Sequence, residues 1–132
     1  MKQVPDILHV HHIMNGVCMH CDVSSTLSEI TCLLVDNNAN AVIVRERGVP
    51  VGIITARDIV RTMVESDTDS IQAKEIMTSP IVSVEHDSDI VSARQVMVNN
   101  NLSKLPVKKE IDIVGLLVQD DIIRDLSWYA RF

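Results

Sequence analysis

Apolar and polar positions follow one succession of patterns that occurs twice along the chain. Each copy begins with a short extended piece, at residues 16–21 and 79–84, followed by apolar residues spaced three or four apart, as in an amphipathic helix. These helical stripes are Leu27, Ile30 and Leu34 in the first copy and Ile90, Ala93 and Met97 in the second. Two apolar strands around a charged turn come next, and a second helix, near residues 57–65 and 120–126, closes each copy. The pattern predicts the order β-α-β-β-α, twice.

The ends of the first helix in each copy carry recognisable signals. Ser25 and Ser88 precede the helical stripes, where a serine side chain can cap the free amides of the first turn. Asparagines follow the stripes, at residues 37–38 and 100–101, and asparagine tolerates the left-handed conformation that ends many helices. We therefore expect serine caps at both starts and left-handed asparagines at both ends.

The two copies align without a gap when Ile13 is placed on Ile76, and identical residues recur in this register to about Val64 and Ser127. The polar, acidic segment between them supplies a linker at residues 67–75. Each copy alone is too small to bury its apolar faces. We therefore expect an α/β (α+β) module in which two repeats, residues 8–66 and 76–132, pack around a pseudo-twofold axis.

Composition narrows the range of partners. The chain has 132 residues, 46% of them apolar, which is enough for a core without metal or disulfide support. A net charge of −6 disfavours nucleic acid, and the one Trp and one Tyr stand together as Trp128 and Tyr129, so base-stacking platforms are missing. Three cysteines and the lack of a long apolar run indicate a cytoplasmic protein without membrane association. Cys32, within the first helical stripe, is expected to be buried.

The segment GIITARD, residues 52–58, could carry ligand chemistry where a strand runs into a helix. Gly52 allows close approach, Thr55 could add a hydroxyl to a phosphate, and Asp58 could accept both hydroxyls of a ribose. The same Thr-x-x-Asp spacing is also that of a capping box, and the spacing alone favours the cap. The second copy keeps Asp121 but has Val118 in place of the threonine, so the aspartate is retained without its capping partner.

Four segments together resemble a tandem pair of cystathionine β-synthase (CBS) domains, a Bateman module. They are IMTSPIVSV, LSKLPV, VGIITARDIV and VGLLVQDDII, and the resemblance covers residues 10–127. It implies a regulatory homodimer that binds an adenosine derivative of the AMP, ADP or ATP class in a cleft between the repeats and signals to a partner protein, as in energy sensing. It implies no enzymatic activity and no required cofactor, and the chain contains no nucleophile elbow and no phosphate-binding P-loop.

The resemblance also implies two crossed sites, each built from both repeats. The first would join Thr55, Arg57 and Asp58 to Thr78, Pro80, Ile81, Val82, Lys104, Leu105 and Pro106. The second would join Asp121 to Asn15, Val17, Cys18, Met19, Asn40 and Ala41. Because the second lacks the threonine hydroxyl and the lysine, we expect it to be the weaker site.

The stretch HVHHIMNGVCMHC, residues 9–21, raises the alternative of a metal sensor. The repeat register places Cys18 on Ile81 and Cys21 on Val84, and residues three apart on a strand point to opposite faces. The register therefore favours a wall of the second cleft over a metal site. The metal candidates that the alternative retains are His9, His11, His12, Cys18, His20 and Cys21. A ligand-free dimerisation module is the other alternative.

Overall fold

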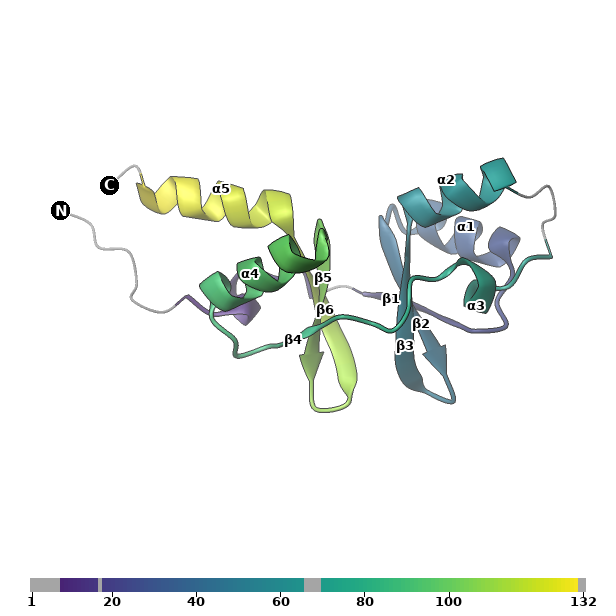
Figure 1. Ribbon diagram of the computed structural model, residues 1–132, viewed down its shortest axis with the longest axis horizontal. Coiled ribbons are helices and arrows are strands. Elements are labelled where there is room, and N and C mark those ends of the chain that lie inside the picture. Colours follow the sequence, from purple (N-terminus) through teal and green to yellow (C-terminus); the bar gives the residue numbers. More distant parts are fainter. Residues whose placement is uncertain (1–7, 17, 66–69, 131–132) are drawn as a thin grey trace. The chain divides into compact units, whose positions relative to one another are not determined.

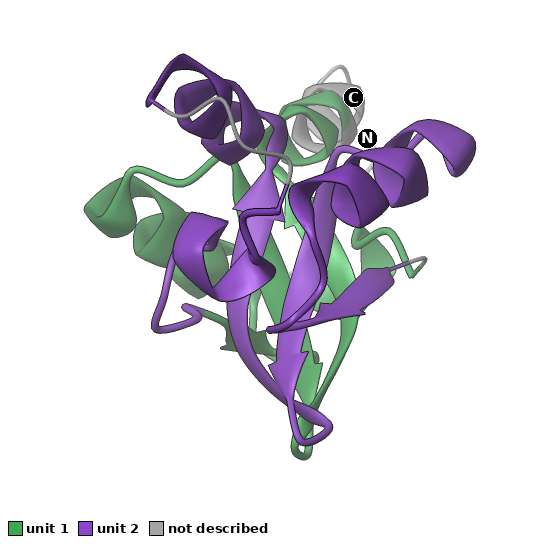
Figure 2. Ribbon diagram, turned by 90° about the vertical axis from the view of Figure 1, so that its right-hand side faces the viewer, with its two compact units in different colours: residues 1–17, 83–132 green, residues 18–82 purple. Residues whose placement is uncertain are grey.

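The computed structural model describes residues 8–16, 18–65 and 70–130, and side chains as far as residue 124 (Figure 1). Val17 and the side chains of Trp128 and Tyr129 lie outside the described part. The chain forms two compact units, coloured separately in Figure 2. Unit 1 comprises Met1–Val17 and Ser83–Phe132, and unit 2 comprises Cys18–Val82. None of the described helices is both long and apolar enough to cross a membrane.

Unit 2 contains one three-stranded sheet and three helices. Its elements are β1 (Met19–Asp22), α1 (Leu27–Asp36), β2 (Ala41–Glu46), β3 (Val49–Thr55), α2 (Ala56–Glu65) and α3 (Ala73–Ile76). β1 pairs with β2 in parallel and β2 pairs with β3 in antiparallel orientation. Arg47 and Gly48 connect β2 to β3 with positive φ angles of 53° and 79°, which suits a tight hairpin whose twist matches its strands.

The core of unit 2 lies between the sheet and its helices. The predicted stripe of Leu27, Ile30 and Leu34 is buried there, together with Val42, Val44, Ile54, Ile59, Ala73 and Ile76. Cys32 does not join this core, because its position on α1 faces away from the stripe and its side chain is exposed. The prediction that Cys32 is buried is therefore wrong.

Unit 1 repeats the architecture. Its elements are the 3₁₀ helix η1 (Val10–His12), β4 (Val84–Glu85), α4 (Ile90–Asn100), β5 (Lys104–Lys109), β6 (Asp112–Val118) and α5 (Gln119–Ala130). β4 is parallel and β6 antiparallel to the central strand β5. Ile90, Ala93 and Met97 are buried, as their spacing predicts. The order β-α-β-β-α, repeated twice, is confirmed.

For α1 and α4, the predicted C-terminal ends are confirmed and the predicted N-terminal caps are not. Asn38 and Asn101 have φ angles of 49° and 54°, so both predicted left-handed asparagines are confirmed. The serine caps are wrong, because each helix begins one residue later than expected. Thr26 accepts a hydrogen bond from the Glu29 amide at 3.2 Å, and Asp89 accepts one from the Ser92 amide at 2.8 Å.

The segments that lead into each repeat pair with the sheet of the other repeat. Thr78 exchanges two backbone hydrogen bonds with Ile53 of β3, at 2.9 and 3.1 Å, and Asn15 does the same with Leu116 of β6, at 2.8 and 2.9 Å. The strand predicted over residues 79–84 is shorter than expected, because residues 79–82 still belong to unit 2 and β4 comprises only Val84–Glu85.

Each of these pairings depends on a glycine opposite the incoming segment. A Cβ atom on Gly52 would lie 2.7 Å from the Met77 sulfur and 2.9 Å from the Thr78 carbonyl oxygen. A Cβ atom on Gly115 would lie 2.6 Å from the Asn15 carbonyl oxygen. These distances are shorter than real Cβ contacts allow, so close approach explains both glycines.

Candidate functional site

Asp58, the third residue of α2, is the one buried charged residue among those that the structure describes, and 4% of its surface is exposed. Its Oδ2 atom accepts hydrogen bonds from the Thr55 amide at 2.9 Å and from the Thr55 hydroxyl at 3.2 Å. Its Oδ1 atom accepts from Arg61 at 2.6 Å and from the Thr78 hydroxyl at 3.2 Å. A buried carboxylate is costly unless it is paired, and this one has four donors.

Local chain geometry explains the first two of these bonds. β3 ends at Thr55 and α2 begins at Ala56, so the strand runs directly into the helix. The first amides of a helix lack partners within it, and an acidic side chain in the first turn can reach back to the residue before the helix. Asp58 reaches back in this way to Thr55, so the capping interaction that the spacing favours is present.

Thr78 comes to Asp58 through the pairing of its segment with β3. The structure therefore brings together three residues of the predicted first site, Thr55, Asp58 and Thr78, within unit 2. Arg57 is exposed at the second position of α2, Pro80 is exposed, and Ile81 and Val82 are half-buried. Lys104, Leu105 and Pro106 lie on β5 of unit 1.

Arg61 is the residue of this site that sequence reasoning missed. It lies one helical turn after Asp58 and forms an ion pair with it, while half of its own side chain is exposed. The sequence held a signal for it, because the repeat register aligns Arg61 with Arg124 and Asp58 with Asp121. A basic residue three positions after an acidic one on a helix is placed for this contact.

The equivalent position in unit 1 is less enclosed. The Asp121 side chain is 31% exposed and pairs with Arg124 at 3.2 Å, its one ion pair within the described side chains. Val118, at the end of β6, stands where Thr55 stands in unit 2 and brings no hydroxyl. Asn15, which occupies the place of Thr78, is exposed and pairs with β6 through its backbone. Copy one therefore has a densely bonded aspartate and copy two an open one.

The remaining residues predicted for the second site belong to unit 2 or lie outside the description. Cys18 and Met19 are half-buried at the start of β1, Asn40 is exposed and Ala41 is buried at the start of β2. Val17 lies outside the described residues. Within unit 1, Asn15 pairs with β6, and Asp121 lies on α5, the helix that follows β6.

The residues at Asp58 suit a ligand with neighbouring hydroxyl groups. A carboxylate accepts hydrogen bonds only, whereas each hydroxyl of a diol can donate one. The two hydroxyls now bonded to Asp58, those of Thr55 and Thr78, can rotate and act as acceptors or donors toward a ligand. A diol could therefore take over donor positions on this carboxylate.

The His- and Cys-rich stretch is divided between the two units. His9, His11 and His12 lie in unit 1 on and beside η1, whereas Cys18, His20 and Cys21 lie in unit 2. Both ring nitrogens of His20 contact the Arg45 guanidinium, at 3.0 and 3.3 Å. Burial, and then the nearby charge of Asp22, raises the pKa of the Cys21 thiol to about 11, and its side chain packs against the core of unit 2. Cys21 is therefore a packing residue at neutral pH.

The His11 imidazole lies beside the rings of His9 and His12. Its pKa lies below the ordinary value because desolvation, and then the neighbouring rings of His12 and His9, disfavour the protonated form. The neutral imidazole has a nitrogen lone pair available for a hydrogen bond or a metal ion.

Comparison with known proteins agrees with this architecture. The model of the CBS domain matches residues 10–65 and 73–127. An uncharacterised protein of Methanopyrus kandleri, MK0525, is 33% identical over 88 residues, which cover 64% of this chain and 45% of that protein. The chain thus matches less than half of that relative.

Solved structures share the fold over nearly their whole length. The CBS domain pair of protein MJ0100, in complex with 5′-methylthioadenosine and S-adenosyl-L-methionine, has a TM-score of 0.80 at 25% identity, covering 90% of this chain and 99% of that one. Hypoxic Response Protein I, with two coordinated zinc ions, has a TM-score of 0.74 at 25% identity, covering 89% and 98%. Because the family model matches both repeats, the chain belongs to the CBS domain family, as a tandem CBS pair.

Proposed function

We propose that the chain is a regulatory module that binds an adenosine derivative through Asp58. The observation that carries the proposal is the placement of a buried carboxylate and two threonine hydroxyls at one point, where β3 meets α2. A ribose offers two adjacent hydroxyls to such a carboxylate. The similar CBS pair of protein MJ0100, solved with two adenosine compounds, supports the same ligand class.

Neighbouring residues of unit 2 suit the other parts of such a ligand. Ile81 and Val82, half-buried, and Pro80, exposed, offer an aliphatic surface to an adenine ring. Arg57 is exposed at the start of α2, where a cation and the free amides of the helix both favour a phosphate. These features favour AMP, ADP or ATP over an uncharged nucleoside, and Lys104 stays a predicted second cation.

The two copies are proposed to differ in affinity. Asp58 has four donors, with one threonine hydroxyl bonded to each carboxylate oxygen, whereas Asp121 pairs with Arg124 and has Val118 in the repeat position of Thr55. A ligand at Asp121 would lack the hydroxyl that Thr55 supplies in unit 2. We infer one strong site, at Asp58, and one weak site, at Asp121.

Regulation would follow from a ligand that binds one conformation better than another. Ligand binding shifts a conformational equilibrium only by its difference in affinity for the two states. The proposed output is a change in a homodimer that a partner protein senses. Small-angle scattering and sedimentation with and without AMP would detect this change, and identical profiles at saturation would contradict it.

Calorimetric titration with AMP, ADP, ATP, 5′-methylthioadenosine and S-adenosylmethionine tests the site directly. Asp58→Asn keeps the side-chain shape but removes the charge, and we expect at least a tenfold loss of affinity, or about 1.4 kcal/mol. The matched Asp121→Asn variant should retain the strong site. Circular dichroism shows whether each variant is folded.

An analogue without the ribose hydroxyls isolates the proposed contact. 2′,3′-Dideoxy-AMP should bind wild-type protein much more weakly than AMP and should not distinguish wild type from Asp58→Asn. Equal affinity of the two nucleotides, or no binding of any adenosine compound, would contradict the proposal and favour a ligand-free dimerisation module.

A further inference from the structure

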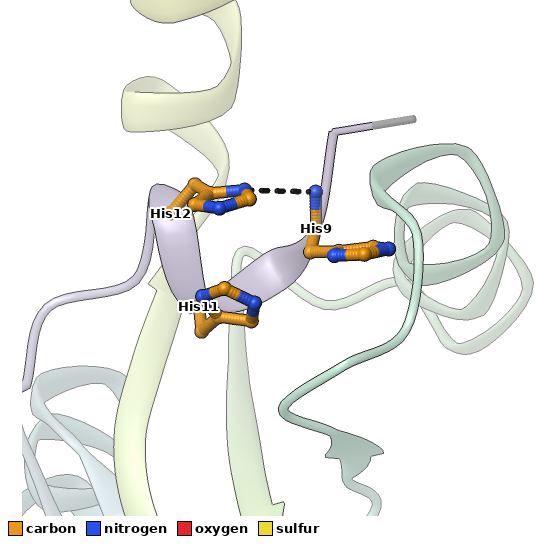
Figure 3. Close-up of side chains that lie close together, drawn as sticks. All are labelled: His9, His11 and His12. Atoms are coloured by element: carbon orange, nitrogen blue, oxygen red, sulfur yellow. Dashed lines mark hydrogen bonds between the residues drawn. The ribbon is translucent and has the colours of Figure 1, made fainter. Parts of the chain in front are cut away.

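Three imidazoles of unit 1 converge at η1. His9 precedes this 3₁₀ helix, and His11 and His12 lie within it. One nitrogen from each ring can be chosen so that all three lie within 4.8 Å of one another, the one such group of three among the described residues (Figure 3). His9 and His12 are three residues apart, and side chains at that spacing superimpose on a 3₁₀ helix. Their rings stack 5.7 Å apart at 11°.

The backbone beneath these rings is held firmly. Val10 is fully buried, and its amide donates to the Ser88 carbonyl at 2.8 Å. The His11 amide donates to the His86 carbonyl at 3.1 Å, and the Ile90 amide donates to the Leu8 carbonyl at 2.8 Å. The turn that presents the rings is therefore fixed to the segment before α4, which lowers the cost of ordering them around a ligand.

The side chains themselves are accessible and have few competing partners. His11 and His12 are exposed and His9 is half-buried. The His12 Nδ1 atom accepts a hydrogen bond from the His9 amide at 3.2 Å, as Figure 3 shows. Coordination by His12 would replace this bond or transfer the ring proton to the other nitrogen. A ligand would displace this hydrogen bond and the reciprocal contact of the His9 side chain with the backbone of His12.

The donor set selects the type of ligand. A set of three imidazole nitrogens suits zinc and related transition metals, whereas magnesium and calcium prefer oxygen ligands. Three histidines and one solvent position make a known open coordination of zinc. His11 is also within 6.1 Å of the His86 ring, measured between centroids, so a fourth imidazole borders the cluster.

We propose that His9, His11 and His12 bind one Zn²⁺ ion per chain, with the fourth position open to solvent. The site lies wholly in unit 1 and does not depend on the adenosine site proposed at Asp58. The repeat register favoured a cleft wall for this stretch, because it places Cys18 and Cys21 on apolar positions of the other copy.

Zinc titration of the untagged full chain in competition with a chromophoric chelator tests the proposal. We expect one Zn²⁺ per chain. Zinc binding should be at least about tenfold weaker in His11→Gln and in His12→Gln, because the loss of an outer-shell partner already costs about tenfold in metal affinity and these histidines are proposed as direct ligands. Gln at position 12 still offers an oxygen acceptor to the His9 amide, so the turn should be kept. His11 is exposed, so His11→Gln should fold and stays informative if another variant does not.

His20→Gln is the matched control, because His20 belongs to the same sequence stretch but lies in unit 2 against Arg45. Its zinc affinity should equal that of the wild type. Cobalt substitution gives a second readout, and a site made of imidazoles should show ligand-field bands without thiolate charge transfer. No zinc binding, unchanged affinity in His11→Gln and His12→Gln, an equal loss in His20→Gln, or a thiolate band would each overturn the proposal.

Discussion

The Thr78 hydroxyl donates a hydrogen bond to the Asp58 carboxylate at 3.2 Å, although 20 residues separate the two in sequence. The contact exists because the segment after the linker returns to β3 before it enters unit 1. It joins the leading segment of one repeat to the helix start of the other. Each unit is thus completed by residues of both sequence repeats.

Gly52→Ala should destabilise the protein. The added methyl group would meet the Met77 sulfur and the Thr78 carbonyl, and overpacking of this kind costs about 1–3 kcal/mol. Urea denaturation followed by circular dichroism would measure the free energy of unfolding. Gly16→Ala is the control, because nothing lies within 4 Å of a Cβ atom there. Equal stability of the two variants would contradict the close approach.

Thr55→Val should weaken AMP binding about fivefold while leaving the fold intact. It removes the hydroxyl that bonds to Asp58 but keeps the backbone bond from the Thr55 amide, and one hydrogen bond contributes about 1 kcal/mol. The change also reproduces the valine found at position 118 of the second copy. Thr31→Val on α1 is the control for the same substitution away from the site. Unaltered AMP affinity in Thr55→Val would argue against a role for this hydroxyl.

As the pH falls into the acid range, the Asp89→Asn variant should lose less of its free energy of unfolding than the wild type does. Hydrogen bonds from the Ser92 amide and hydroxyl lower the pKa of the Asp89 carboxyl in the folded state. A lowered folded pKa gives stability that is complete above the unfolded value, about 3.9, and that is lost as pH falls through the folded pKa. Asparagine still accepts from the amide but does not titrate in this range.

Urea midpoints of wild type and variant, measured from neutral pH into acid, should therefore converge at low pH. Asp36→Asn, at the exposed end of α1, controls for the loss of one negative charge. A constant difference between wild type and Asp89→Asn at every pH would exclude the titration of Asp89 as the cause.

Cys21 should react slowly with a thiol reagent and Cys32 quickly. The thiolate is the reactive form, and a pKa of about 11 leaves little thiolate on Cys21 near neutral pH, where its side chain is also partly covered. Cys32 is exposed on α1. Reaction of native protein with a chromogenic disulfide, followed by peptide mapping, should identify Cys32 before Cys21.

In native Cys32→Ser, peptide mapping should show no rapid labelling of Cys21, and Cys21 should react quickly only when urea unfolds the chain. Rapid modification of Cys21 in the native Cys32→Ser variant would show that its burial is wrongly assigned.

Local patterns were sufficient for the elements of each repeat. The stripe of Leu27, Ile30 and Leu34 and its counterpart Ile90, Ala93 and Met97 face the interior because helical periodicity places them on one side. The Thr55–Asp58 contact could likewise be predicted, because it spans three residues at a helix start. Caps were misplaced by one residue, since adjacent Ser25 and Thr26, or Ser88 and Asp89, can both serve as caps.

The amino-acid sequence by itself determined the repeat, the order of helices and strands and the family to which the chain belongs, because these depend on periodicity and on motifs in a constant register. The family resemblance implied that Thr78 lies near Asp58, but the tertiary structure decided the hydrogen bond between them and the backbone pairing of each leading segment with the sheet of the other repeat. It also decided that the three clustered histidines belong to a different compact unit from the two nearby cysteines. Spacing along the chain carries no information about either until the backbone path is known.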